Sequence, residues 1–369
     1  MSEDKKFMAH TLALSARAQG SASPNPAVGA VVVREGRVVG QGLHRQAGQP
    51  HAEVLALTQA GAAARGADLY VNLEPCNHQG RTPACTQAIL QAGIKRVVYG
   101  AADPNPLAGG GGSFLAAQGL EVQGGMLAER CRHTHRFFLT WITSGRPYVI
   151  LKSAVSLDGR IADASGHSQW ISGEKARREA HRLRSQVDAV MVGAGTVLAD
   201  NPRLSSRIKN GRNPVRVVVD SRLSTPPQAA MLDEPGRTVI ACVIKASKEK
   251  AQALVARGAQ IMPLPGDEKG RVDLTCLLPT LAREGITSIL AEGGGELAFS
   301  LARLKFIDEL NLFMAPIIIG GKSAPSFVGG DGFATLAEAL PFTVPTVRRL
   351  GKDLFLSARR KEDEPCSPD

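Results

Sequence analysis

Short apolar runs alternate with stretches of helical spacing along the first part of the chain. Apolar residues predict buried strands that end at Val33 and Gly42, joined by a hairpin turn, and further strands at 67–73 and 96–100. Apolar residues three and four positions apart predict helices at 7–18, 51–63 and 83–93, and a last helix that ends near Gly145. Strands that alternate with helices in this way are typical of a three-layer α/β/α sandwich.

A second alternating pattern begins after the turn cluster Ser144-Gly145-Arg146-Pro147. Buried strands are predicted from Tyr148, at 187–192, at 215–220 and at 288–291. The chain has 369 residues, which favours two cores over one. We therefore expect domains at 1–145 and 146–361, followed by a polar tail at 362–369 that is disordered.

The composition describes a globular protein of the cytoplasm. Hydrophobic residues make up 43% and charged residues 21% of the chain, enough to build a substantial core. No apolar run approaches the length of a membrane span, and the first residues lack a signal-peptide core. The six cysteines are irregularly spaced, unlike the disulfide framework of a small secreted domain.

The net charge of +10 restricts the class of partner. Clustered basic residues neutralise phosphates in nucleic-acid binding proteins, but here they are dispersed. Aromatic residues make up only 4%, which leaves few platforms for stacking bases. We therefore expect anionic small molecules, such as a phosphorylated sugar, as partners rather than nucleic acid or a membrane.

The clearest chemical signal combines His51-Ala52-Glu53 with Cys76 and Cys85. One imidazole and two thiolates suit Zn²⁺, and three protein ligands leave the fourth tetrahedral position to water, as in catalytic sites. Bound zinc lowers the pKa of that water from about 15.7 towards roughly 7. Glu53, at the start of a helix, is placed to accept the water's proton and pass it to a leaving amine. The helix predicted after Pro83 favours the thiolate of Cys85.

Each of these residues also has an ordinary interpretation. A lone H-x-E occurs by chance in many chains, and free cysteines are often buried small hydrophobes. The order of His51, Glu53, Cys76 and Cys85, each near the end of a predicted element, favours the zinc site.

The same residues resemble the zinc-dependent nucleoside and nucleobase deaminases, whose signature is H-x-E followed by P-C-x-x-C. Here the cysteines are nine positions apart, separated by Asn77-His78-Gln79-Gly80-Arg81-Thr82-Pro83-Ala84. That longer insertion is similar to one branch, the bifunctional deaminase-reductases of riboflavin biosynthesis. The resemblance implies substrate-binding roles in the first domain for Asn25, His44, His78, Arg81 and Asn105. Asn25 alone is equally compatible with a simple turn. The Gly109–Gly112 run departs from the usual family pattern, and we expect a flexible loop there.

Glycines between a strand and a helix indicate a cofactor site in the second half. Gly293-Gly294-Gly295 follows the strand at 288–291, and backbone N–H groups of such a loop can contact a pyrophosphate. A tight strand-to-helix turn without a ligand would show the same three glycines. Gly193-Ala194-Gly195-Thr196 lacks the third glycine of a Rossmann fingerprint, so a standard Rossmann domain is not expected. A basic group at Arg222 can meet the 2′-phosphate that distinguishes NADP from NAD.

The stretch from Tyr148 to Ala162, with Ser168-Gln169-Trp170-Ile171-Ser172, resembles the reductase domain of the same family, which is similar to dihydrofolate reductase in fold. The segments 308–316 and 317–321 resemble the closing strands of that domain. The resemblance implies NADPH as cofactor and two sets of residues. The implied substrate positions are Lys152, Ser168, Arg184, Asp200, Leu204, Arg207 and Glu292. The implied cofactor positions are Ala154, Trp170, Thr196, Asp200, Arg222, Gly293, Gly294, Gly295 and Glu296. Arg184 and Arg207 suit phosphate recognition, although exposed arginines are commoner. Whether Lys152 and Glu292 protonate or orient the substrate stays open.

Taken together, the resemblance implies two successive reactions. The first deaminates 2,5-diamino-6-ribosylamino-4(3H)-pyrimidinone 5′-phosphate to 5-amino-6-(5-phosphoribosylamino)uracil. The second reduces the ribosyl group to give 5-amino-6-(5-phosphoribitylamino)uracil, and the family tendency is to form homo-oligomers. Two alternatives remain: a nucleic-acid editing deaminase, which has no use for a reductase half, and a zinc-stabilised binding protein, which has no need of Glu53.

Overall fold

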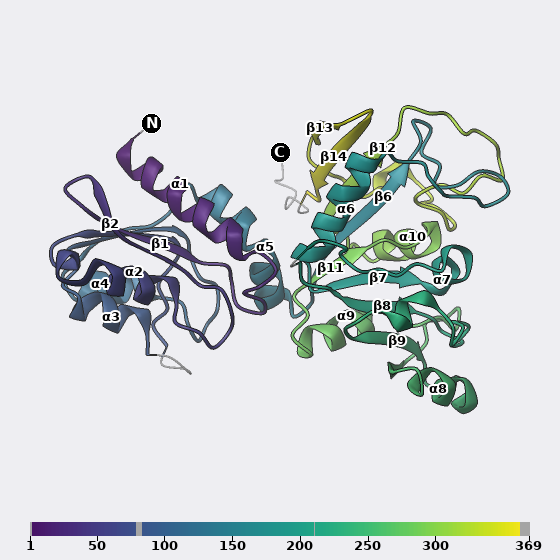
Figure 1. Cartoon of the computed structure of the whole chain (residues 1–369), viewed down its shortest axis with the longest axis horizontal. Coiled ribbons are helices and arrows are strands. Elements are labelled where there is room, and N and C mark those ends of the chain that lie inside the picture. Colours follow the sequence, from purple (N-terminus) through teal and green to yellow (C-terminus); the bar gives the residue numbers. More distant parts are fainter. Residues whose placement is uncertain (1, 79–82, 210, 362–369) are drawn as a thin grey trace. The chain divides into compact units, whose positions relative to one another are not determined.

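The computed structural model describes residues 2–78, 83–209 and 211–361, so the tail expected at 362–369 lies outside the described residues. The chain separates into two compact units, Met1–Arg146 and Pro147–Asp369, which we describe one at a time (Figure 1). None of the helices in the described part of the chain has the length and hydropathy that a membrane crossing requires.

The first unit is built on a mixed sheet with the strand order β2-β1-β3-β4-β5 in its described residues. Its strands are β1 (Gly29–Arg34), β2 (Arg37–Leu43), β3 (Asp68–Leu73), β4 (Arg96–Ala101) and β5 (Glu121–Gln123). Its helices are α1 (Glu3–Ser15), α2 (Ala52–Ala60), α3 (Cys85–Gln91), α4 (Gly111–Ala117) and α5 (Ala128–Ser144), with 3₁₀ turns η1 (Ala16–Ala18) and η2 (Gly61–Ala64). β2 and β3 run antiparallel to β1, whereas β3, β4 and β5 are parallel.

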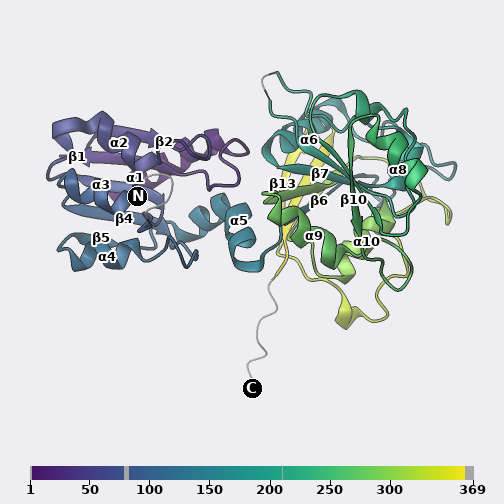
Figure 2. The ribbon, with the colours of Figure 1, turned by 90° about the horizontal axis from the view of Figure 1, so that it is seen from below.

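Helices cover both faces of this sheet. α1 and α5 contact each other on one face, while α2, α3 and α4 follow one another on the other face (Figures 1 and 2). Strand β1 is buried except at its last residue, as its uninterrupted apolar sequence requires for a central strand. The predicted three-layer α/β/α arrangement is therefore confirmed.

The glycine run 109–112 is not a flexible loop. Gly110 adopts a left-handed conformation with φ 82° immediately before α4, and Gly111 and Gly112 form the first turn of that helix. A Cβ atom on Gly111 would lie 1.9 Å from the carbonyl oxygen of Pro75, so only glycine allows the helix to start this close to the segment that follows β3.

The second unit contains a large sheet with the order β10-β9-β8-β7-β11-β6-β12-β14-β13 in its described residues. Its strands are β6 (Tyr148–Val155), β7 (Ala189–Gly193), β8 (Val215–Val219), β9 (Thr238–Val243), β10 (Ala259–Leu264), β11 (Ser288–Ala291), β12 (Glu309–Met314), β13 (Thr346–Leu350) and β14 (Asp353–Arg359). Its helices are α6 (Glu174–Gln186), α7 (Ala194–Asp200), α8 (Lys248–Val255), α9 (Leu274–Arg283) and α10 (Gly295–Arg303), with 3₁₀ turns η3 (Ala230–Asp233) and η4 (Leu336–Glu338).

The strands from β10 to β12 are parallel, and β14 and β13 continue the sheet in antiparallel fashion. The run 317–321, expected to form a closing strand, lies outside regular structure, and Ile318 is exposed. β13 and β14 close the sheet instead. The carboxyl ends of β6, β11 and β7 meet at one edge, where α7 and α10 begin, and ligands of parallel sheets bind at such edges.

Candidate active sites

Three side chains from separate elements of the first unit form a metal-ligand cluster. His51 immediately precedes α2, Cys76 follows β3, and Cys85 is the first residue of α3. Nδ1 of His51 lies 3.2 Å from Sγ of Cys85 and 3.5 Å from Sγ of Cys76. The three ligand atoms lie within 4.8 Å of one another. Bonds of about 2.0–2.3 Å to zinc require such a span, so this donor set fits a zinc ion with one position open.

The two thiols of the cluster differ in acidity. A hydrogen bond from the Cys85 thiol, helped by His51, lowers the pKa of Cys76 to about 4. The same hydrogen bond and burial raise the pKa of Cys85, so Cys76 rather than Cys85 carries the thiolate in this arrangement. A dication at this place favours both thiolates, because its charge stabilises them and displaces the shared proton.

Glu53 stands next to this cluster in the first turn of α2 and is only 4% exposed. Burial raises the pKa of its carboxyl group, opposed by the nearby His51. A buried carboxyl group beside a metal-ligand cluster, with its pKa raised, is a suitable group for taking up and releasing a proton. Glu53 therefore has the properties of a proton carrier.

The cluster opens into a cavity of about 500 Å³. Of the residues expected to bind substrate in this unit, Asn25, His44, His78 and Asn105 line the cavity, together with His51, Glu53 and Cys76. Arg81 lies outside the described residues. All described members of the expected set therefore come together at one place.

A hydrogen-bond chain orients Asn25 in this cavity. Nδ1 of His44 lies 3.1 Å from the carbonyl oxygen of Pro50, and Nε2 of His44 lies 3.1 Å from Nδ2 of Asn25. Burial lowers the pKa of His44, which favours the neutral ring. The neutral ring donates from Nδ1 to Pro50, so Nε2 accepts from the Asn25 amide. The carboxamide oxygen of Asn25 then remains available to accept a hydrogen bond from an N–H group of a ligand ring.

Sequence reasoning missed Glu74, which joins two walls of this cavity. Its Oε1 accepts a hydrogen bond from the N–H of Gly112 at 2.9 Å, and its Oε2 accepts one from the N–H of Asp103 at 3.1 Å. These bonds fix the loop that carries Asn105 against the loop that carries Cys76. The signal was present in the sequence, because an acidic residue at the end of a buried strand needs donors nearby.

The second unit has a larger cavity of about 890 Å³ at the carboxyl ends of β6, β11 and β7. The expected substrate residues Lys152, Ser168, Arg184, Leu204, Arg207 and Glu292 all line it. The expected cofactor residues Ala154, Trp170, Thr196, Asp200, Gly293, Gly294, Gly295 and Glu296 also line it. Arg222 does not; it is exposed, three residues after β8.

Glu292 is the centre of a buried ionic group in this cavity. Arg184 donates from Nε and Nη2 to its two carboxylate oxygens, both at 2.8 Å, and Nζ of Lys152 lies 3.5 Å from Oε2. Burial alone would raise the pKa of Glu292, but the cations of Arg184 and Lys152 hold it well below its usual range. Because Glu292 occupies the Arg184 guanidinium, Arg207 is the better placed of the two expected phosphate ligands.

The glycine loop before α10 fits a phosphate-bearing ligand. The N–H of Gly294 points to Oγ1 of Thr196 at 3.2 Å, and a Cβ atom on Gly294 would meet nothing closer than that oxygen, at 3.8 Å. A Cβ atom on Gly295 would instead lie 2.6 Å from the backbone nitrogen of Gly329. Gly294 therefore borders open space, whereas Gly295 allows close packing of the protein itself.

Trp170 and Asp200 occupy other parts of the cavity wall. The indole of Trp170 is 67% exposed, and the Arg177 guanidinium lies 4.7 Å from its ring centroid. Oγ of Ser168 donates to Oδ1 of Asp200 at 2.8 Å. An exposed indole held by a cation offers a flat face on which a planar ring can stack.

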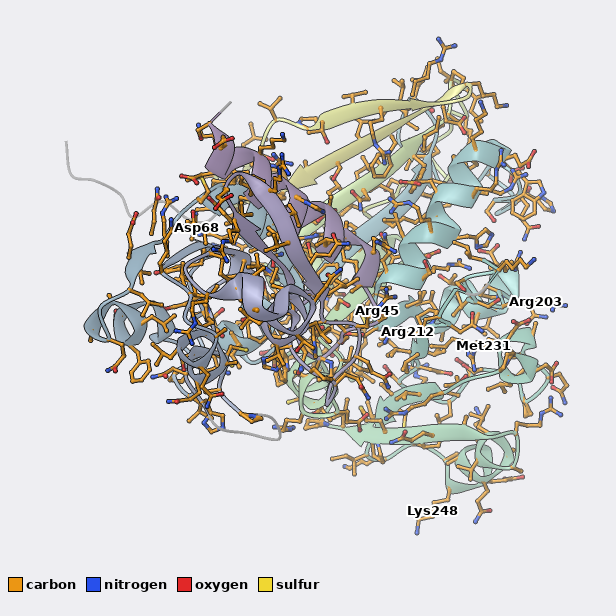
Figure 3. All side chains as sticks on the ribbon, turned by 60° about the vertical axis from the view of Figure 1, so that its left-hand side comes forward. Arg45, Asp68, Arg203, Arg212, Met231 and Lys248 are labelled. Atoms are coloured by element: carbon orange, nitrogen blue, oxygen red, sulfur yellow. The ribbon has the colours of Figure 1, made fainter. Side chains whose placement is uncertain are left out.

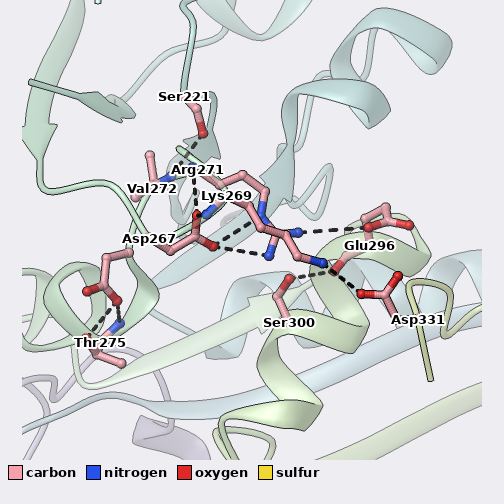
Figure 4. Close-up of polar contacts among 10 residues, drawn as sticks. Ser221, Asp267, Lys269, Arg271, Val272, Thr275, Glu296, Ser300 and Asp331 are labelled. Atoms are coloured by element: carbon pink, nitrogen blue, oxygen red, sulfur yellow. Dashed lines mark hydrogen bonds and ion pairs between the residues drawn. The ribbon is translucent and has the colours of Figure 1, made fainter. Parts of the chain in front are cut away.

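A hairpin after β10 forms the rim next to Glu296 (Figure 4). The guanidinium of Arg271 lies between Asp267, at 3.1 Å, and Glu296, at 4.0 Å. The N–H of Val272 donates to Oγ of Ser221 at 3.0 Å, which joins this hairpin to the segment that carries Arg222. Arg222 therefore directly follows a residue that contacts this hairpin, although Arg222 is not among the residues that line the cavity.

Sequence reasoning also missed Arg177 and His181, which line the second cavity from α6. With Arg184 they occupy positions i, i+4 and i+7 of one helix, which place them on the same face. That spacing of three basic residues was a readable signal.

Two further arginines of the second unit are matched by carboxylates. Arg203, which also lines the cavity, pairs with Glu234 at 2.9 Å, and Arg212 pairs with Asp188 at 2.6 Å. Both arginines belong to the segment between α7 and β8, whereas Lys248 is the first residue of α8 (Figure 3). The charges of Arg203 and Arg212 are therefore compensated within the protein.

Comparison with known families defines the class. Residues 1–101 match the cytidine and deoxycytidylate deaminase zinc-binding region, and residues 147–356 match the RibD C-terminal domain. The fold, the His-Cys-Cys cluster and the second cavity together define a zinc-dependent deaminase joined to a reductase. This result confirms the expected class of enzyme, with zinc and NADPH as its cofactors.

Individual relatives extend the match over the whole chain. The riboflavin biosynthesis protein RibD of Bacillus amyloliquefaciens is 40% identical over 362 residues, which are 97% of each chain. That of Escherichia coli (strain K12) is 38% identical over 96% of this chain and 98% of its own. The chain belongs to the RibD family of riboflavin biosynthesis proteins.

Solved structures agree with this assignment. Acinetobacter baumannii RibD (form 1) has a TM-score of 0.86 at 36% identity and covers 98% of this chain and 99% of its own. The diaminohydroxyphosphoribosylaminopyrimidine deaminase/5-amino-6-(5-phosphoribosylamino)uracil reductase of Thermotoga maritima has a TM-score of 0.85 at 35% identity and covers 97% of this chain and 99% of its own. The expected fold class, a cytidine-deaminase-like domain followed by a dihydrofolate-reductase-like domain, is confirmed.

Proposed function

We propose that residues 1–145 deaminate 2,5-diamino-6-ribosylamino-4(3H)-pyrimidinone 5′-phosphate and that residues 146–361 then reduce the product, 5-amino-6-(5-phosphoribosylamino)uracil. The substrates follow the activity named for the Thermotoga maritima relative. The observation that carries the proposal is the presence of two chemically different cavities, one with a His-Cys-Cys cluster and Glu53, the other with a glycine loop and an ionic centre at Glu292.

In the first cavity the reaction exchanges an amine for an oxygen. His51, Cys76 and Cys85 would hold zinc, which would supply Lewis acidity and lower the pKa of a water molecule. The water oxygen bonds to the amine-bearing ring carbon, and the bond from that carbon to the amine breaks. Glu53 carries one proton of the water to the departing nitrogen, which leaves as ammonia, and the other proton stays on the pyrimidine ring. Asn25 and His44 hold the pyrimidine ring, with the Asn25 oxygen as acceptor, and His78, Arg81 and Asn105 complete the substrate contacts.

In the second cavity the ribose is reduced. Gly293–Glu296, Thr196 and Trp170 would hold NADPH, which would supply a hydride for C1 of the sugar. The C1–O4 bond of the ring breaks, O4 takes up a proton, and C1 gains a hydrogen. The ammonium group of Lys152 supplies that proton, and the carboxylate of Glu292 orients Lys152 and the sugar. Ser168, Leu204 and Arg207 hold the rest of the substrate. Arg184 keeps Glu292 ionised and in place.

Product analysis by mass spectrometry tests both steps. Purified zinc-loaded protein is given the diaminopyrimidine phosphoribosyl substrate with and without NADPH. We expect only 5-amino-6-(5-phosphoribosylamino)uracil without NADPH, and 5-amino-6-(5-phosphoribitylamino)uracil with it. No deamination refutes the substrate of the first cavity, and no effect of NADPH refutes the role of the second.

We also infer that the protein is a homo-oligomer. Within the described residues β13 has a sheet neighbour on one side. Val347 of this strand is 56% exposed, and Val344, two residues before the strand, is 91% exposed. The outer backbone groups of an edge strand, next to exposed apolar side chains, favour pairing with a second copy. Size-exclusion chromatography with light scattering tests this inference, and a monomer at micromolar concentration refutes it.

The location and the absence of nucleic-acid partners are inferred on separate grounds. Cys76, Cys85, Cys131, Cys242 and Cys276 are free thiols, which suits a reducing compartment such as the cytoplasm. The basic residues are dispersed along the sequence, and Arg203 and Arg212 of the second unit are paired with carboxylates, which disfavours a continuous basic surface for a phosphate backbone. NADPH should raise the melting temperature, and an oligonucleotide at the same concentration should not.

A further inference from the structure

One polar group of the second cavity has no place in the proposed reaction. His181 lines the cavity from α6, one helical turn before Arg184. Its Nδ1 atom is buried and has no hydrogen-bond partner among residues 2–78, 83–209 and 211–361. Nε2, the other ring nitrogen, is not among the buried atoms that lack a partner. Because buried polar atoms nearly always have a partner, the unpaired Nδ1 restricts which nitrogen carries the proton.

The missing partner determines the tautomer of the ring. A buried N–H without an acceptor is rarer in proteins than a buried acceptor without a donor. The neutral ring therefore carries its proton on Nε2 rather than Nδ1. Burial, together with the charges of Arg184 and Arg207, lowers the pKa of His181 to about 4 and keeps the ring neutral at physiological pH. The result is a neutral N–H donor at the cavity wall.

The charges around the ring indicate which part of a ligand it meets. The charged groups that act on His181 come from every side of the cavity: Arg184 of α6, Arg207 of the loop after α7, Lys152 of β6 and Glu292 after β11. Glu292 is bound by Arg184 and Lys152, so its charge is compensated. Arg207 therefore leaves a net positive charge next to His181, and an anionic group is the complementary ligand.

We propose that His181 is a substrate-binding residue of the reductase cavity, where its Nε2–H and the Arg207 guanidinium bind the phosphate monoester of the substrate. This inference rests on the proposed function, because the phosphate is that of 5-amino-6-(5-phosphoribosylamino)uracil. It also explains why Arg184 can be committed to Glu292, since His181 takes over the role expected of Arg184.

Steady-state kinetics of the full-length protein provide the first test. His181→Leu should raise the KM for 5-amino-6-(5-phosphoribosylamino)uracil about tenfold or more, the scale of one hydrogen bond to a charged group, and leave kcat nearly unchanged. The KM for NADPH should not change. His181→Gln should restore most of the affinity, because its amide is also a neutral donor. His167→Gln, a substitution at a surface histidine whose side chain is 82% exposed, is the matched control.

Binding of ribose 5-phosphate provides a second test that does not depend on turnover. In protein labelled with ¹³C at histidine, the signal absent from the His181→Gln spectrum identifies His181. We expect that signal to move when ribose 5-phosphate is added, without protonation of the ring between pH 6 and 8. This experiment remains informative even if the proposed reduction is not observed.

Several results would overturn the inference. A fall in kcat at constant KM would make His181 a participant in the chemical step instead. A rise in the KM for NADPH would assign it to the cofactor phosphates. If His181→Gln were as impaired as His181→Leu, or if the His181 signal did not respond to ribose 5-phosphate, the phosphate contact would be wrong.

Discussion

The two cavities of this protein hold their charges in opposite ways. In the first unit His51, Cys76 and Cys85 converge beside the buried carboxyl group of Glu53, and the two thiols accommodate each other by sharing a proton or by binding a metal ion. In the second unit Glu292, Arg184 and Lys152 already neutralise one another. The first site is therefore completed by its metal, and the second is organised before any ligand arrives.

This difference predicts different consequences when one group is removed. A ligand set that depends on a metal loses its chemistry when a ligand is lost, because nothing else holds the ion. A buried ion pair loses stability when one partner is lost, because the other charge stays buried without compensation. Substitutions in the two cavities should thus separate loss of activity from loss of stability.

The largest expected effect follows removal of a metal ligand. Cys85→Ser should lose zinc, and deamination should fall by at least about 10²-fold, more than is typical for loss of an outer-shell partner of a metal ligand. Reduction of the uracil intermediate should continue. Zinc content by mass spectrometry and separate assays of the two reactions measure this outcome. Cys276→Ser, in the second unit, is the control; stoichiometric zinc in Cys85→Ser would refute the ligand assignment.

Removal of the proton carrier should be almost as severe but leave the metal in place. Glu53→Gln keeps the size of the side chain and removes its ability to accept a proton. Deamination should fall by roughly 10²–10⁴-fold, the usual contribution of a positioned acid-base group. Zinc content and reductase activity should match the wild type, as they should in the surface control Glu129→Gln. Unchanged deamination would exclude Glu53 from the mechanism.

Removal of one partner from the ionic group around Glu292 should lower the stability of the second unit. Arg184→Met leaves Glu292 buried with only the longer contact to Lys152, and the second unit should lose about 3–5 kcal/mol. Arg182→Met removes a partly exposed pair with Glu179 from the same helix and should cost less than about 1 kcal/mol. Calorimetry or urea unfolding of both variants measures the difference. Equal losses would mean that Glu292 does not depend on Arg184.

The same contrast explains what the sequence could predict. The ligands and Glu53 lie in short motifs at element ends, so residue type and spacing alone identified them. The second cavity draws on residues from Lys152 to Glu296, brought together only by the order of the parallel strands, and there the family resemblance supplied the residues. Neither source identified Glu74 or His181. The sequence shows an acidic residue at a strand end and a helical spacing of basic residues, but the groups that each side chain meets appear only once the elements are packed. The glycine run 109–112 was misread for a similar reason, since its cause is the approach of Gly111 to Pro75.

Acid should weaken the first unit through a residue outside its cavity. His135 of α5 is 2% exposed, and neither ring nitrogen has a hydrogen-bond partner among the described residues. Burial lowers its pKa from 6.5 to about 4. Between pH 6.5 and pH 4 the unfolded chain binds a proton at His135 that the folded chain does not. The contribution of His135 to the free energy of unfolding is therefore constant above pH 6.5 and falls as the pH drops towards 4. The total loss should reach about 3 kcal/mol.

Urea unfolding of the first unit between pH 4 and 7.5 measures this loss. His135→Leu removes the titrating group, and its stability should depend less on pH by about the same amount. Zinc ligands also protonate in acid, but they do so equally in both proteins, so the difference between the two curves isolates His135. Parallel curves would show that His135 does not control the acid response.

The smallest expected effect concerns the glycine loop and tests whether the second cavity is shaped for a ligand. Gly294 has φ −67°, which any residue can adopt, and its Cβ position borders open space. Gly294→Ala should therefore leave the melting temperature unchanged but weaken NADPH binding by about tenfold, since an added methyl group occupies space that the cofactor phosphates need. Gly295→Ala should instead lower the melting temperature of the second unit, because its methyl group would collide with the backbone of Gly329. Titration calorimetry with NADPH and thermal unfolding distinguish the two variants. Unaltered NADPH affinity in Gly294→Ala would mean that the cofactor does not approach this loop.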